Sequence, residues 1–192
     1  MSTPDTNGDV GARARAWRNG AHAAVCDLIE PWAHGTIVRA TRYPSYYDYN
    51  LVRVEEDPRM SLEALVAFAD EALAGLEHRR FDFDDVVVAD ALRPGFRAIG
   101  WKTVRLMWMH HESPPPPGPD IEVREVPYDA VHGLRVDWHG EDFPDEAAAA
   151  YHAQARAVAM SRGVRVLAVY EGDRPIAFAQ LEHDGDAAEI GQ

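Results

Sequence analysis

The spacing of apolar residues divides the first half of the chain into helices and strands. Trp17, Ala21, Val25 and Leu28 recur at helical spacing, so the pattern predicts a helix over residues 13–29 that ends before a proline. Residues 35–43 and 49–56 alternate as strands do, on either side of a tyrosine-rich link. A second helix is predicted over residues 61–80, with a serine in position to cap its first turn.

Residues 81–111 predict two further strands with a short break between them. Residues 81–90 contain the consecutive apolar residues Val86, Val87 and Val88, as expected of a strand that is buried on both faces. Residues 91–101 predict a short helix or turn broken at Pro94 and Gly95, and residues 102–111 predict another strand.

A run of four prolines separates this half from a second, differently ordered half. Residues 113–119 predict an extended linker, because proline lacks an amide donor. The pattern then restarts with a strand at 121–126, helices at 128–142 and 144–163, and an antiparallel meander over 164–171, 175–183 and 187–192. We therefore expect a disordered N-terminus at 1–11, a first lobe at 12–112, the linker at 113–119 and a second lobe at 120–192.

Composition and charge narrow the possible partners. The 192 residues are 46% hydrophobic, enough for a packed core, and carry a net charge of −13, which would repel nucleic acid and anionic membrane surfaces. We found no secretory signal or long apolar run, which predicts a cytoplasmic protein without membrane or nucleic-acid partners. Cys26 is the only cysteine, so a disulfide within the chain is excluded, and it is expected on a buried helix face.

Nine histidines raise the question of a metal site. His110 and His111 are adjacent, so on a strand they would point to opposite faces. His132 and His139 lie seven residues apart and could share a helical face, with acids at 141–142 beyond them. Because no known ligand spacing is present, we predict solvated or capping histidines and no metal.

The sequence does not decide the roles of two clusters of residues. The tyrosines near residue 45 could line a ligand cleft or pack over the end of a sheet with their hydroxyl groups in water; they are Tyr43, Tyr46, Tyr47 and Tyr49. The acids in residues 82–85 and 139–146 predict a solvated surface and helix starts, but they could also attract a cationic amine.

The order of elements resembles the GNAT superfamily of acyl-CoA-dependent N-acyltransferases. The second half, from "IEVREV" through "RVLAVYEGDRPIAFAQLE", is similar to the opening half of that fold, and "ALRPGFRAIGWKTVRLMWM" is similar to its closing half. The resemblance implies an α/β fold with a mixed, largely antiparallel sheet flanked by helices. It further implies a tandem protein, with a divergent first lobe and an incomplete second lobe.

The same resemblance implies acetyl-CoA as cosubstrate and a small-molecule or peptide amine as acceptor. In the family a glycine-rich loop after the fourth strand holds the coenzyme pyrophosphate through backbone amides. Here the chain stops at Gln192 before that loop, which we interpret as a truncation, and residues 57–65 of the first lobe have no glycine. Phe96 stands where many members carry a general-acid tyrosine.

Glu189 is the candidate catalytic residue. It lies on the last predicted strand, where many family members carry a glutamate that acts as general base through a water. The alternatives are an ordinary strand acid and, for the whole chain, a non-catalytic binding module built on the same fold. An unpaired edge of the last strand could also recruit a second copy, which predicts a homodimer.

Overall fold

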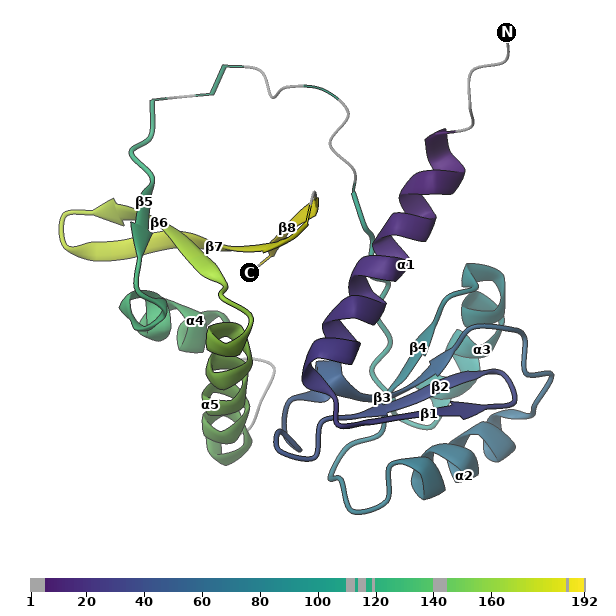
Figure 1. Cartoon of the computed structure of the whole chain (residues 1–192). Helices are drawn as coiled ribbons and strands as arrows, with labels where there is room; N and C mark the ends of the chain where they lie inside the picture. The colour runs from purple at the N-terminus through teal and green to yellow at the C-terminus, as the bar shows by residue number, and fades with distance from the viewer. Residues whose placement is uncertain are drawn as a thin grey trace, which may run out of the picture. The chain divides into compact units, whose positions relative to one another are not determined.

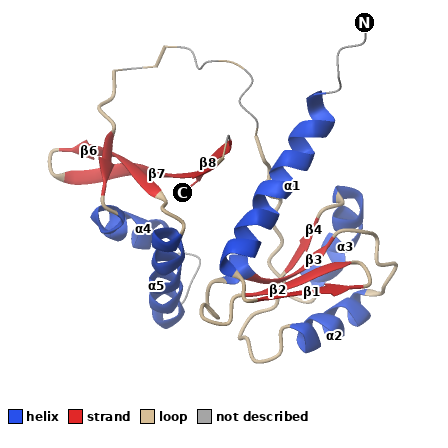
Figure 2. Cartoon of the chain, viewed as in Figure 1, coloured by secondary structure: helices blue, strands red, loops and turns tan. Residues whose placement is uncertain are grey.

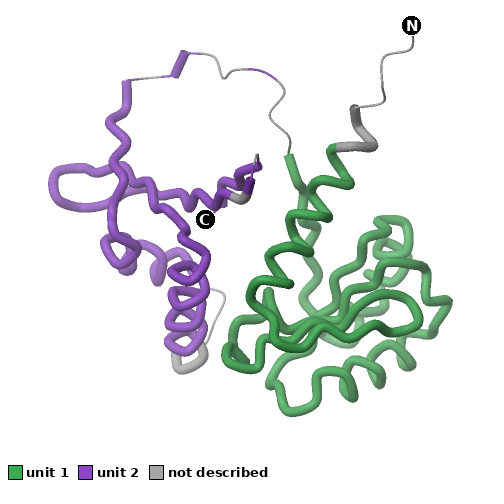
Figure 3. The backbone as a smooth tube through the Cα atoms, viewed as in Figure 1, with its two compact units in different colours: residues 1–112 green, residues 113–192 purple. Residues whose placement is uncertain are grey.

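The chain is divided into two compact units, residues 1–112 and 113–192, which we describe separately (Figure 3). The computed structural model describes residues 6–109, 113, 117–118, 120–139, 145–185 and 187–191. In these ranges it contains five α-helices and two four-stranded sheets that are mostly antiparallel, so the fold is mixed α/β (Figures 1 and 2).

Unit 1 is built on a four-stranded sheet of order β1-β2-β3-β4. β1 pairs with β2 and β2 with β3 in antiparallel fashion, whereas β3 and β4 are parallel and joined through α2. The elements in chain order are α1 (Thr6–Val25), β1 (Leu28–Trp32), β2 (Gly35–Arg39), the 3₁₀ turn η1 (Tyr47–Tyr49), β3 (Asn50–Val54), α2 (Leu62–Ala72), β4 (Phe81–Phe83) and α3 (Val86–Ala98).

The two faces of this sheet differ in chemistry. One face is apolar: Val52 and Val54 of β3 pack against Leu73 and the α2 side chain Phe68. α3 joins this side through Phe96, which contacts both phenylalanines of β4. The opposite face is covered by α1 (Figure 1), and it carries Arg53, the residue between the two valines.

Helix α2 begins as predicted. The Ser61 hydroxyl accepts a hydrogen bond from the Ala64 amide, which satisfies one of the amides that a helix N-terminus leaves open. The predicted strands at 35–43 and 49–56 are also present as β2 and β3.

The predicted helix over 13–29 was wrong at both ends. α1 starts earlier and stops at Val25, and Leu28 and Ile29 belong to β1, where both are exposed. Pro31 does not close a helix but lies within β1. A proline is tolerated there because β1 is an edge strand, so one side of it has no ladder to complete.

The predicted strand over 81–90 was also wrong beyond its first residues. β4 ends at Phe83, and Val86 and Val87 lie exposed in the first turn of α3. The Asp85 carboxylate accepts the Val87 and Val88 amides, so a helix cap overrides the strand preference of three valines.

α3 continues through Pro94 and Gly95, where the sequence predicted a break. A Cβ atom added to Gly95 would approach the Leu62 Cδ2 atom of α2 to 3.0 Å. The glycine therefore permits close packing of two helices.

A strand was predicted over 102–111, but its described residues, 102–109, have no regular secondary structure. They are held beside α3 by side chains, because Arg97 donates to the Thr103 hydroxyl and Arg105 to Asp90. Their apolar side chains, including Met107 and Met109, remain exposed.

Unit 2 contains the second sheet, of order β5-β6-β7-β8 with all neighbours antiparallel. Its core packs Val131, Val166 and Phe178 between this sheet and the preceding turn and helices. The elements match the predicted order: β5 (Arg124–Val126), η2 (Tyr128–Val131), α4 (His132–His139), α5 (Asp145–Ser161), β6 (Arg165–Glu171), β7 (Arg174–Asp184) and β8 (Ala187–Gly191).

Asn50 organises the tyrosine-rich link of unit 1. Its side chain is fully buried, donates to the carbonyl oxygens of Tyr43 and Tyr46, and accepts the Ala40 amide. We predict that Asn50→Ala lowers the free energy of unfolding by about 3 kcal/mol, because it leaves buried partners unsatisfied. Chemical denaturation should measure this, with the exposed Glu77→Gln as control. If Asn50→Ala lowered the free energy of unfolding less than the control does, the structural role assigned to Asn50 would be contradicted.

Candidate functional site

The densest group of charged side chains in unit 1 lies between α1 and the sheet. Arg18 of α1 forms an ion pair with Asp82 of β4, whose side chain is 16% exposed. Arg80 donates to the same carboxylate, with 3.1 Å between its Nε atom and Asp82 Oδ1, and also pairs with Asp48 of η1. One carboxylate thus joins two guanidinium groups from separate elements.

Arg53 forms the centre of this group. Its side chain is 9% exposed, and its Nε atom lies 2.8 Å from Glu55 Oε1. Another of its nitrogens donates to the Asn19 side chain and lies 3.4 Å from His22 Nδ1. We call the set Arg18, Asn19, His22, Asp48, Arg53, Arg80 and Asp82 the charged seam.

His22 is held neutral in the charged seam. It is 3% exposed, and its Nε2 atom lies 3.1 Å from the Asp48 carbonyl oxygen, which can only accept a hydrogen bond. Nε2 therefore carries the proton and Nδ1 presents its lone pair to Arg53. Burial, followed by the charge of Arg18, lowers the pKa of His22 from 6.5 to about 4.

Asp84 borders the charged seam. Burial is the main reason why its pKa is raised above the ordinary value, although Arg53 acts in the opposite direction. In the charged seam three guanidinium groups meet two carboxylates, and both carboxylates are engaged in ion pairs. Its only histidine is tied to a carbonyl oxygen, so the arrangement does not favour proton transfer.

Glu189, the predicted catalytic residue, lies on β8 of unit 2. It stands directly opposite Glu182 of β7, so both side chains project from the same face. Glu182 forms an ion pair with Arg162, which follows α5, and both side chains are largely buried. The structure therefore places Glu189 beside a second carboxylate that is already neutralised in part.

The N-terminus of α2 is where the resemblance would place a pyrophosphate loop in unit 1. Instead, Ser61 caps the helix, and the Asp57 side chain accepts the Arg59 amide. Glu55, Glu56 and Asp57 are all exposed immediately before the helix. Carboxylates in this position repel an anionic ligand, so this helix end does not offer a phosphate site.

The tyrosine cluster packs around the end of the sheet. Tyr49 is buried, with its ring centroid 5.1 Å from that of Tyr46, and the Tyr47 ring packs against His78 at 4.3 Å with a tilted geometry. Phe96, at the position of the family's general acid, is buried against Phe81 and has no proton to donate.

Cys26 lies just after α1, where its thiol donates to the Tyr49 carbonyl oxygen. Burial and the neighbouring Asp27 raise the pKa of this thiol to about 12, so it is a poor nucleophile.

The histidines of unit 2 come together in a way that the sequence did not indicate. His132 and His139 of α4 both contact His152 of α5, with ring centroids 6.0 and 5.5 Å apart. Within the described ranges, no three His, Cys, Asp or Glu side chains are arranged to hold a metal ion. The pair at 110–111 and the acids at 141–142 lie outside the described residues.

The charged seam itself was missed in the sequence. Its residues come from α1, η1, β3 and β4, and Arg18 and Asp82 are 64 positions apart. The sequence contained one signal for it. Arg15, Arg18 and His22 recur at helical spacing and form a polar face of the helix, but the helix was predicted from its apolar residues alone.

Comparison with protein-family models, curated proteins and solved structures found no match to this chain. Of the helices described, none has the length and apolar character needed to cross a membrane.

The neutral state of His22 predicts a pH dependence. Because its pKa is lower in the folded than in the unfolded protein, the unfolded state takes up the proton first as pH falls. Stability is therefore complete above pH 6.5 and declines towards pH 4, by up to about 3 kcal/mol. Denaturation of the whole chain between pH 7.5 and 4 should show this slope, and His22→Gln should flatten it.

His183→Gln, at an exposed position of β7, provides the control and should keep the wild-type slope. Equal slopes for His22→Gln and the wild type would show that His22 is not the titrating group.

Proposed function

We propose that this chain belongs to the lineage of GNAT-type acyl-CoA-dependent N-acyltransferases and serves as a binding module on the amine side of that chemistry. The order of elements in unit 2 supports the lineage. A strand, two helices and a three-stranded antiparallel meander follow one another, as the opening half of that fold requires.

Unit 1 adds a second topological argument. β3, α2 and β4 form a parallel crossover that is followed by α3, within a sheet that is otherwise antiparallel. This is the strand, helix, strand and small helix expected of the closing half. Because fold alone does not define function, the lineage needs support from individual sites.

The N-terminus of α2 carries the proposal of a binding module. One of its amides, that of Ala64, is capped by Ser61, and three acids rather than a glycine-rich loop precede the helix. A pyrophosphate would face repulsion from these acids. These features support a first lobe that follows the element order expected of a coenzyme lobe but lacks the electrostatics that a coenzyme needs.

Glu189 supports a role on the amine side. Glu182 and Glu189 stand directly opposite each other, and Arg162 forms an ion pair with Glu182. An ammonium group beside this pair would be attracted to both carboxylates. In a complete acyltransferase the same carboxylate would accept a proton, through water, from the amine that attacks the thioester.

The first prediction from this proposal concerns the coenzyme. Excess acetyl-CoA should leave the thermal unfolding midpoint of the 192-residue chain unchanged, because a ligand raises the midpoint only if it binds the folded state. Differential scanning calorimetry with and without acetyl-CoA measures this. A rise that grows with acetyl-CoA concentration would establish a coenzyme site and overturn the binding-module proposal.

The second prediction concerns the amine. Spermidine should bind the chain, and Glu189→Gln should weaken that binding about fivefold, as loss of one partly exposed charge contact implies. Isothermal titration calorimetry at low salt provides the measurement. Glu171→Gln, an exposed acid of the same unit, is the matched control. If both variants lose affinity equally, attraction is due to net charge and Glu189 has no special role.

A further inference from the structure

Helices α4 and α5 of unit 2 lie side by side and meet through histidine side chains (Figure 1). His152 of α5 contacts both His132 and His139 of α4, and its ring meets each of theirs edge-on, at interplanar angles of 83° and 86°. The Nδ1 atom of His139 donates to the Arg135 carbonyl oxygen at 3.0 Å, which fixes this ring beside His152. Three imidazole groups, the side chains whose charge ordinarily changes near neutral pH, are thus brought together by two helices.

His152 is buried without a hydrogen-bond partner. It is 5% exposed, and neither Nδ1 nor Nε2 of its ring has a partner among the described residues. A neutral imidazole can be buried in this way at a moderate cost, but a protonated one carries two N–H donors and a full charge, which makes its burial far more costly. The contact between α4 and α5 therefore favours the neutral form of His152.

Arg135 brings a permanent positive charge to the same contact. It is 4% exposed, and its guanidinium carbon lies 4.4 Å from the ring centroid of Tyr128 and 4.5 Å from that of Phe178. Burial is the main reason why the pKa of His152 is lowered, and the charges of the two α4 histidines and of Arg135 act in the same direction. A second buried charge beside Arg135 is thus disfavoured twice.

The other titratable groups around this contact do not neutralise a protonated His152. Asp129 of η2 lies near the first of the α4 histidines, but Arg156 of α5 binds both of its carboxylate oxygens at 2.6 Å. Asp137 of α4 lines a cleft at the start of β7. Tyr151 contacts the His152 ring, with 5.6 Å between the ring centroids, and a phenol is uncharged near neutral pH.

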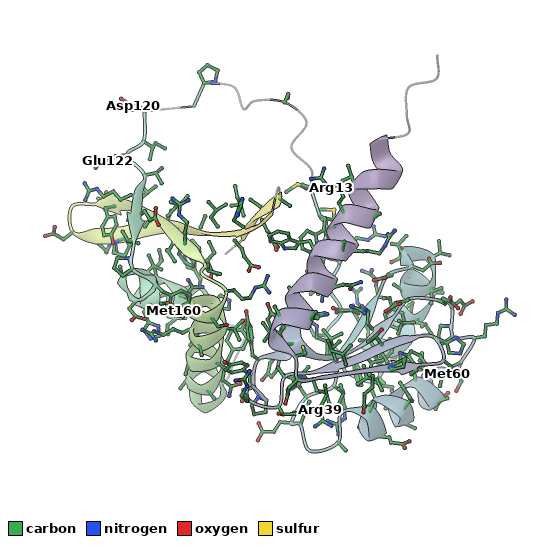
Figure 4. All side chains as sticks on the ribbon, viewed as in Figure 1. Arg13, Arg39, Met60, Asp120, Glu122 and Met160 are labelled. Carbon is green, nitrogen blue, oxygen red and sulfur yellow. The ribbon has the colours of Figure 1, made fainter. Side chains whose placement is uncertain are left out.

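We propose that the contact between α4 and α5 is a pH-sensitive switch, closed while His152 is neutral and opened when its imidazole takes up a proton in mildly acidic solution. In the open state the N-terminal half of α5 separates from α4, and water hydrates the charged ring. The separation also breaks the contact between Tyr151 and His139. The C-terminal half of α5, where Figure 4 labels Met160, stays in place because Ala159 belongs to the core of unit 2.

The direction of the switch follows from proton linkage. Because the pKa of His152 is lower in the closed than in the open state, the open state takes up the proton first as pH falls. The contact is therefore complete above about pH 6.5, the ordinary pKa of histidine, and weakens below it. This inference does not rest on the proposed function and concerns unit 2 alone.

Hydrogen exchange of the whole chain, resolved by segment and corrected for the pH dependence of the intrinsic rate, measures the opening. Between pH 7.5 and 5.5 the amides of residues 148–154 should exchange severalfold faster. The limit is about tenfold, as expected when one histidine of ordinary pKa gains a proton only in the open state. The amides of β6 and β7 should keep their protection, which distinguishes opening of this contact from unfolding of unit 2.

Three variants assign the effect. His152→Gln removes the titrating group and should abolish the acceleration. His183→Gln, at an exposed position of β7, is the matched control and should retain it. His132→Gln, also at an exposed position, removes one neighbouring positive charge and should reduce the acceleration. Because this last variant keeps His152, it tests the switch even if His152→Gln does not fold.

Several results would overturn the proposal. One is wild-type exchange in residues 148–154 that does not change with pH, and another is an acceleration that either His152→Gln or His132→Gln leaves unchanged. Loss of protection in β6 and β7 in the same proportion would show that the whole unit unfolds. An NMR titration of the ring C–H groups is an independent measurement: His152 should titrate at lower pH than His183, and an equal or higher midpoint would equally reject the switch.

Discussion

A buried guanidinium group in a central strand is the constraint on which unit 1 depends. β3 is buried along its whole length, and the Arg53 side chain lies on the face that α1 covers, so it reaches water only if α1 moves. A charge in this position is costly unless it is paired and hydrogen-bonded. Glu55, Asn19 and His22 provide those contacts, and two of the three belong to α1. Arg53 thereby ties α1 to the sheet, whereas the neutral state of His22 follows from burial and from the charge of Arg18.

This constraint has a consequence for how firmly α1 is held. Hydrogen bonds and ion pairs that satisfy a buried charge offset its desolvation but add little net stability. Apolar contacts, by contrast, stabilise in proportion to the area buried, and unit 1 uses them on the opposite face, where Val52, Val54 and Phe68 meet. One sheet thus packs apolar side chains on one face and satisfies a buried charge on the other.

The elements that were predicted correctly are those determined by interactions between residues close together in the sequence. Ser61 marks the start of α2, and the turns of the unit 2 meander follow from alternation and glycine. The errors arose where two signals competed: Val86–Val88 favour a strand, but the preceding Asp85 carboxylate caps a helix. The charged seam could not be predicted from the sequence, because its members are brought together only by the tertiary structure, as Arg18 and Asp82 are. Glu189 was placed on a strand correctly, but its neighbour Glu182 follows from the register of β7 and β8.

In unit 1, the backbone topology and the charge of the side chains favour opposite kinds of ligand. A parallel crossover such as β3–α2–β4 presents a helix N-terminus at the end of a strand, and that geometry favours an anion in any chain that adopts it. Here the three residues after β3 are Glu55, Glu56 and Asp57, which reverse the preference without altering the backbone. In unit 1 a backbone geometry that ordinarily favours anions is therefore combined with acidic residues, which attract cations instead.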